Sequence, residues 1–211
     1  MKFMKLQTLK AGLPKALALL ILLFMLPVSA STMKWNNQQK SYYTNKIVFS
    51  PYNSKKNDMF GFASYYYDST LVVSTKNRKL YIFNDIDGDG KFSSHDYQQL
   101  TPSDENSSGY FGNAIAHTGD TLLIGARSEN SSVNKYTGAV YQIIDTDQDK
   151  DFSEESMVKI TSSLFAPSFG RYGESIAAEN NTLVIGATKD GSAGSVYIIV
   201  DSNMNGDFED N

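Results

Sequence analysis

A short apolar segment followed by an acidic loop occurs three times in this chain of 211 residues. The apolar segments are residues 80–83, 140–144 and 196–200. The first acid of each following loop lies at position 85, 145 or 201, so successive loops are 60 and 56 residues apart. A recurrence at this spacing indicates repeated supersecondary units, each of which contributes one layer to a larger core.

The first loop has the sequence Asp-Ile-Asp-Gly-Asp-Gly over residues 85–90. Acids at positions 1, 3 and 5 with glycine at position 6 match the calcium loop of the EF-hand, in which oxygen ligands converge on one hard cation. The predicted Ca²⁺ ligands are Asp85, Asp87, Asp89, the carbonyl of Lys91, Ser93 and Asp96. The segment before the loop is β-type rather than an amphipathic helix, so this is not a true EF-hand.

The second and third loops depart further from this template. The second has Lys150 where glycine is expected, and the third has asparagine at positions 3 and 5. Their predicted ligands are Asp145, Asp147, Asp149 and Asp151, then Asp201, Asn203, Asn205 and Asp207. Fewer charges predict weaker binding in the third loop. For all three loops, ordinary Asp-Gly turns that need no metal remain an alternative.

The N-terminus has the pattern of a targeting segment. Four lysines and no acid precede an apolar stretch at 16–26, which ends in Pro27 and a small-residue motif at 28–30. This pattern predicts a signal peptide over 1–30, followed by a polar lead-in over 31–45. An uncleaved anchor is the alternative, but the apolar stretch is short for a membrane span, and no later stretch is long enough. We therefore expect a secreted or cell-surface protein, extracellular or periplasmic.

Charge and cysteine content narrow the classes of partner. Cleavage after Ala30 would remove four of the 19 basic residues and leave 23 acids, a net charge of −8. This balance argues against nucleic acid and anionic membranes as partners. The chain has no cysteine, so disulfides cannot stabilise it after export. A cation that binds only the folded state can supply such stabilisation.

The repeated units predict an all-β fold. Each unit contains about four short apolar segments separated by turn residues, which is the pattern of antiparallel β-propeller blades. The expected blades span about 46–98, 99–157 and 158–211, and the first strands are expected at 46–50, 99–101 and 159–161. About three blades form a partial or open propeller.

Two recurring pairs carry a resemblance to a known family. Phe111-Gly112 is followed by Gly125-Ala126, and Tyr172-Gly173 is followed by Gly186-Ala187. These pairs resemble FG-GAP repeats, the blades of integrin-α-like β-propellers, and look most like those of bacterial exported proteins. The resemblance runs from about residue 46 to the C-terminus and implies a propeller fold.

Departures from the family pattern limit which functional residues of the family can be assigned to this sequence. The proline that usually follows Gly-Ala is replaced by Arg127 and Thr188. The family's calcium loop lies between the two pairs, where residues 113–124 contain only Asp120 as an acid. The calcium prediction therefore rests on the three acidic loops described above.

The number of blades indicates that other chain segments or partner chains are needed to close a propeller. A closed FG-GAP propeller resembles a seven-bladed ring, which three units cannot close, and this chain stops within its third acidic loop. We expect a fragment or truncated reading frame, or else an open arc whose edges pair with other chains. Further blades or a partner chain would complete the propeller.

The sequence shows no catalytic constellation. There is no cysteine, no Gly-x-Ser-x-Gly motif and no phosphate loop, and the two histidines, His95 and His117, are expected in a loop and at a strand end. We therefore expect no enzyme, but a secreted calcium-binding propeller module that binds a protein or glycan. The alternatives are an ancillary propeller of a larger exported hydrolase and a purely structural repeat array.

Overall fold

The computed structural model describes residues 48–102, 109–131, 134–162 and 169–209. Within these ranges the chain forms eleven strands and no helix, which confirms the all-β prediction. Accordingly, this part of the chain contains no helix that could span a membrane. The predicted signal peptide and lead-in lie outside the described residues.

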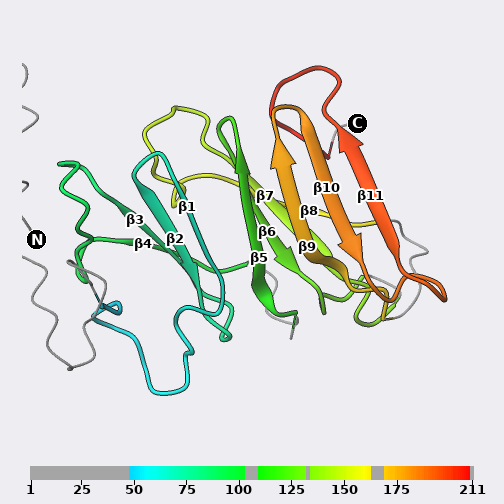
Figure 1. Ribbon diagram of the computed structural model, residues 1–211, viewed down its shortest axis with the longest axis horizontal. Helices are drawn as coiled ribbons and strands as arrows, with labels where there is room; N and C mark the ends of the chain where they lie inside the picture. The colour runs from blue at the N-terminus through cyan, green and yellow to red at the C-terminus, as the bar shows by residue number, and fades with distance from the viewer. Residues whose placement is uncertain (1–47, 103–108, 132–133, 163–168, 210–211) are drawn as a thin grey trace, which may run out of the picture. The chain divides into compact units, whose positions relative to one another are not determined.

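The strands form three antiparallel sheets, each in sequential strand order (Figure 1). The first sheet contains β1 (Ser64–Tyr67), β2 (Thr70–Ser74), β3 (Leu80–Asn84) and β4 (Gln98–Leu100). The second contains β5 (Phe111–Thr118), β6 (Thr121–Ala126), β7 (Ala139–Ile144) and β8 (Met157–Ile160). The third contains β9 (Tyr172–Glu179), β10 (Thr182–Ala187) and β11 (Ser195–Val200). These open four-, four- and three-stranded meanders match the expected blades of a partial propeller.

The sheets begin one strand later than the units expected from the sequence. Residues 99–101 were expected to open the second unit, but Leu100 pairs with Leu80 and closes the first sheet. The strand near 159–161 closes the second sheet in the same way. The acidic loop between β3 and β4 turns the chain back, so the strand after the loop pairs with the strand before it. Residues 48–50, from the expected first strand, are not in a strand.

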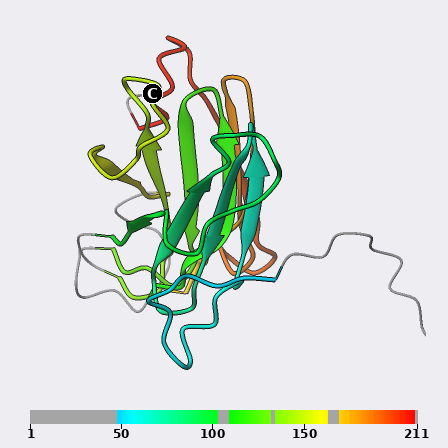
Figure 2. The same ribbon diagram turned by 90° about the vertical axis from the view of Figure 1, so that its left-hand side faces the viewer.

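Two apolar clusters fill the spaces between neighbouring sheets, which lie one behind another in Figure 2. Side chains alternate between the two faces of a strand. Leu122 and Ile124 of β6 accordingly join the cluster shared with the first sheet, and Leu123 joins the cluster shared with the third. All six residues of β6 are buried. The second sheet is thus the covered middle layer, as its nearly continuous apolar sequence suggests.

An edge-to-face aromatic pair recurs in every sheet. Phe60 meets Tyr81 at 5.7 Å between ring centroids, and Phe111 meets Tyr141 at 5.3 Å. In the third sheet Tyr172 meets Tyr197 at 5.1 Å. This geometry is favoured by the ring quadrupoles and adds to the energy of burial. In the second and third sheets the pair joins the first and third strands, and in the first sheet it joins β3 to Phe60 in the segment before β1.

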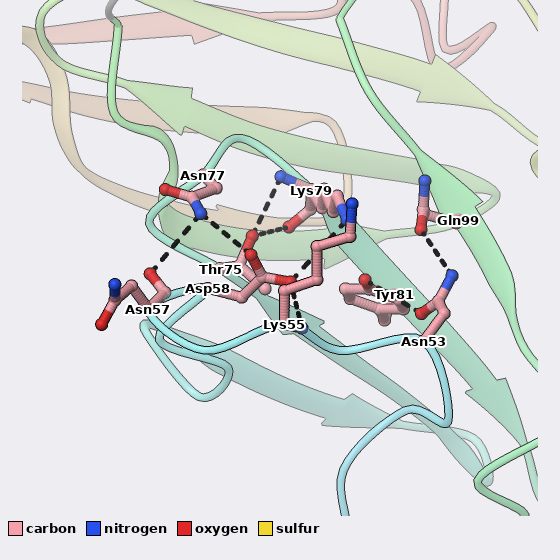
Figure 3. Close-up of polar contacts among 9 residues, drawn as sticks. All are labelled: Asn53, Lys55, Asn57, Asp58, Thr75, Asn77, Lys79, Tyr81 and Gln99. Carbon is pink, nitrogen blue, oxygen red and sulfur yellow. Dashed lines mark hydrogen bonds and ion pairs between the residues drawn. The ribbon is translucent and has the colours of Figure 1, made fainter.

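A buried carboxylate holds the segment before the first sheet against the β2–β3 turn (Figure 3). Asp58 accepts hydrogen bonds from the amide of Lys55 at 2.9 Å and from the side chain of Asn77 at 2.9 Å. Lys79 lies 3.7 Å from the same carboxylate. The segment also carries Phe49 and Phe60, which cover Phe83 on the outer face of the first sheet.

The third sheet has one uncovered apolar face. Val196 and Ile198 of β11 are 68% and 67% exposed. The position that corresponds to Val196 in the second sheet is Val140, one residue before the equivalent tyrosine, and it is fully buried against the third sheet. In the second sheet the corresponding face is therefore covered by the third sheet, whereas in the third sheet this face is exposed.

Candidate metal centres

The three acidic loops span residues 85–96, 145–156 and 201–209, and each follows the third strand of a sheet. In Figure 1 they are spread from the left of the picture to the upper right, each at the end of its sheet that the third strand reaches. Antiparallel pairing explains this, because the end of β7 at Ile144 pairs with the start of β6 at Thr121. The same pairing places the β5 and β7 starts at the opposite end of the sheet.

A shared hydrogen-bond scaffold shapes all three loops. The first aspartate accepts a hydrogen bond from the amide at position 6, at 2.9 Å in the first loop, 3.0 Å in the second and 2.7 Å in the third. The side chains at positions 3 and 5 each accept the amide two residues further along. Side-chain oxygens at alternate positions are thereby turned towards the inside of the loop.

Lys150 adopts the conformation for which glycine is usually needed. Its φ is 65°, close to the 75° of Gly90 in the first loop. The strain is offset by contacts to the first sheet: the Lys150 carbonyl accepts hydrogen bonds from Asn84 at 3.2 Å and Gln98 at 2.6 Å, and its Nζ donates to the Asp68 carbonyl at 2.8 Å. The unexpected lysine therefore fits the loop without changing its shape.

Carboxylates converge in the first two loops. One carboxylate oxygen from each of the first three predicted acids lies within 4.8 Å of the others, in the groups Asp85–Asp87–Asp89 and Asp145–Asp147–Asp149. Oxygens of this kind are the ligands that Ca²⁺ prefers. In the third loop Asp201 is joined by Asn203 and Asn205, which offer neutral oxygens at the same positions.

Two buried oxygens in these groups have no hydrogen-bond partner among the described residues. They are Oδ1 of Asp85 and Oδ1 of Asp145. Asp145 is only 6% exposed, so its carboxylate is largely removed from water. An unpaired charged oxygen at such a position is costly unless a proton or a cation compensates for it. The residues present therefore fit a bound cation.

The remaining predicted ligands lie around these groups. Ser93 Oγ accepts the His95 amide at 3.2 Å. Lys91 forms an ion pair with Asp89, and this contact is the main reason why the pKa of Asp89 is lowered. Asp96 is outside the group of three acids and lines a hollow with Asp151.

The acids at position 7 stabilise the following turn. Asp151 accepts hydrogen bonds from the Ser153 hydroxyl at 2.6 Å and amide at 2.9 Å, and these bonds lower its pKa. Asp207 accepts the Glu209 amide at 2.9 Å. Hydrogen bonds of this kind also occur at positions 3 and 5, and in the EF-hand template position 7 contributes its backbone carbonyl.

Two features were not assigned a role from the sequence. Glu155 folds back onto the second loop, where it accepts hydrogen bonds from the Thr146 amide at 2.9 Å and hydroxyl at 2.7 Å. The phenylalanine at position 8 is 2% exposed in both Phe152 and Phe208 and packs between two sheets. The recurrence of a phenylalanine at position 8 of all three loops was the sequence pattern that could have indicated this packing role.

Residues 95–144 match the family model of the FG-GAP repeat. The chain carries an FG-GAP repeat. No curated protein matches the chain. FG-GAP repeats are β-propeller-like units and are generally non-catalytic. The match spans β4 to β7, so it covers the last strand of the first sheet and three of the four strands of the second.

The glycines of the FG-GAP repeat lie where neighbouring sheets come into close contact. A Cβ at Gly112 would lie 2.4 Å from that of Ser74 in the preceding sheet, and a Cβ at Gly125 would lie 2.3 Å from the Gly173 carbonyl. The pairing of β5 with β6 is irregular between Phe111 and Ile115, next to Gly112. The glycines thus allow neighbouring sheets to approach closely and bend the first strand.

Proposed function

We propose that this chain is an exported, calcium-stabilised, non-catalytic propeller module that binds a protein or glycan partner. The observation that carries the metal assignment is the buried, unpaired Oδ1 of Asp145 within a group of three carboxylates. Calcium bound there would neutralise the crowded acids and hold the loop in one conformation. Export is supported by the sequence pattern of residues 1–30.

The metal sites are structural in this proposal, because the loops join neighbouring sheets. The second loop contacts the first sheet through Lys150 and Phe152, and the third contacts the second sheet through Gly206 and Phe208. A cation that orders a loop also orders the contact between two sheets. The connecting loops at the other end of the sheets then remain as surfaces for recognition.

The open face of the third sheet supports a further partner. Val196 and Ile198 present apolar side chains at positions where the preceding layers are covered by another sheet. A further blade, from a longer form of this chain or from a partner chain, would bury these side chains, and a fourth strand equivalent to β4 and β8 would pair with the open edge of β11. This completion would extend the same sheet-to-sheet packing.

Isothermal titration of the purified chain with calcium tests the metal assignment. We expect a saturable heat signal that is reduced by at least one site in Asp145→Asn and unchanged in Asp68→Asn, an exposed acid outside the carboxylate groups. Equal titrations of the wild type and Asp145→Asn would contradict the proposal. Retention of the chain on immobilised glycans or on cell surfaces tests the recognition role.

A further inference from the structure

A small hollow lies at the end of the sheets opposite the acidic loops. It has a volume of about 190 Å³ and is lined by Ser128, Tyr136, Phe169, Arg171 and Lys189. These residues come from the β6–β7 connection, the segment before β9 and the turn after β10. None of them belongs to the metal loops or to the packing between sheets.

Two aromatic rings form one wall of the hollow. Tyr136 and Phe169 are stacked, with ring centroids 5.2 Å apart and an angle of 29° between the ring planes. They are 36% and 56% exposed, so the stacked pair is not part of the core. An exposed stacked pair offers a flat apolar surface with electron-rich ring faces.

The charge around the hollow is opposite in sign to that of the whole chain. Lys189 and Arg171 line it, and Arg127 lies nearby, with its Nη1 2.9 Å from the Glu174 carboxylate. The same carboxylate lies 3.1 Å from Arg171 Nη1. Glu174 is thus shared by Arg127 and Arg171, and Lys189 adds a further cation to the lining, although the chain carries a net charge of −4. A positive site of this kind favours an anionic group.

The backbone of the hollow is held in an unfavourable conformation. The φ angles of Tyr136, Phe169 and Arg171 are 56°, 70° and 60°, in the left-handed region that bulky residues seldom adopt. Backbone hydrogen bonds fix these loops to one another: the Phe169 amide donates to the Lys135 carbonyl at 3.0 Å, and the Lys189 amide donates to the Gly170 carbonyl at 3.1 Å. Strain that is maintained in this way is typical of ligand sites.

From these features we infer that the hollow binds one acidic sugar unit of a glycan. The C–H face of a sugar ring can stack on the Tyr136–Phe169 pair, while its carboxylate meets Lys189 and Arg171. The volume is below the roughly 300–1,000 Å³ of pockets for drug-sized ligands, which favours a single ring. This inference rests on the proposed recognition function and specifies its ligand class as a uronate-bearing glycan.

Saturation-transfer NMR with a glucuronate–glucose disaccharide and with cellobiose, its neutral counterpart, tests the inference. We expect transfer to the acidic disaccharide and at least tenfold less to cellobiose. The signal should fall at least fivefold in Lys189→Gln and in Phe169→Ala, and it should fall with added salt. Lys76→Gln and Tyr66→Ala, which remove an exposed cation and an exposed aromatic ring from the first sheet, should leave it unchanged.

Three outcomes overturn the inference. They are equal transfer to both disaccharides, unchanged transfer in both hollow variants, and preferential binding of a poly-glutamate peptide, which would indicate an acidic protein partner. Thermal melts of each variant test whether the fold is retained. A chain that is stabilised by calcium but does not bind the uronate contradicts this inference alone. Uronate binding without any effect of calcium contradicts only the metal assignment.

Discussion

The side-chain oxygen of Gln142 accepts a hydrogen bond from the backbone amide of Phe208 at 3.0 Å. Gln142 lies in the second sheet, and Phe208 is position 8 of the acidic loop that follows the third. One layer earlier, Gln98 accepts the amide of Phe152 at 2.9 Å. Each of these two loops is thus attached to the sheet before it, which links any ion bound in the loop to the packing of the sheets.

Replacement of Gln142 by alanine should destabilise the protein by about 1–3 kcal/mol, because it leaves the buried amide of Phe208 without a partner. Gln148→Ala is the matched control, since this exposed glutamine bonds only at the surface, to Asp120. The control should change stability by less than about 0.5 kcal/mol. Urea denaturation measures both, and equal losses would contradict the proposed attachment of the loop.

Phe152→Ala should cost about 3–5 kcal/mol, because it opens a cavity between the first and second sheets. Phe169 is 56% exposed, and its replacement by alanine removes mainly a stacking contact. The loss there should stay below about 1.5 kcal/mol. Denaturation midpoints give the comparison, and a small effect at Phe152 would show that this residue is not an inter-sheet anchor.

Gly112→Ala should destabilise more than Gly191→Ala. Both glycines have positive φ, 87° and 66°, but only at Gly112 would the new Cβ meet a neighbour, the Cβ of Ser74 at 2.4 Å. The difference between the variants isolates the steric cost, about 1–3 kcal/mol. If the close approach is responsible, the additional change Ser74→Gly should recover part of the loss in a double-mutant cycle. Additive losses would exclude this explanation.

Asp58 should make the free energy of unfolding depend on pH in the acid range. Hydrogen bonds from the Lys55 amide and the Asn77 side chain lower the pKa of Asp58 below its ordinary value of 3.8. A lowered pKa in the folded state stabilises the fold above 3.8, and this contribution is lost as pH falls through the folded-state pKa. The difference in unfolding free energy between wild type and Asp58→Asn should be constant near neutral pH and shrink below about pH 4. A difference that persists to about pH 2 would contradict this.

The repeated strands and the scaffold of the loops were predictable because they depend on local patterns. Short apolar segments bounded by turn residues indicate the strands, and Asp or Asn at positions 1, 3 and 5 indicates the loops. The pairing of β4 with β3 was missed because a short strand such as Gln98–Leu100 carries no signal of its partner. Its partner is determined by the hairpin geometry of the loop.

Contacts between units were the least predictable part. Arg127 and Thr188 replace the proline of the family pattern and were noted only as departures. In the structure both contact the Glu174 carboxylate, and hydrogen bonds from them outweigh burial and lower its pKa. Arg127 lies 47 positions before Glu174, and Thr188 lies 14 positions after it. No local pattern in the sequence encodes the convergence of these three residues.

A thermal melt of the chain in excess calcium and in chelator shows whether bound calcium stabilises the fold. We expect an increase in Tm with calcium of about 5–10 °C per site at 100-fold excess over Kd. The increase should be smaller in Asp145→Asn and unchanged in Asp68→Asn. A cooperative melt at the same temperature in calcium and in chelator would contradict calcium stabilisation and identify the acidic loops as turns that need no metal.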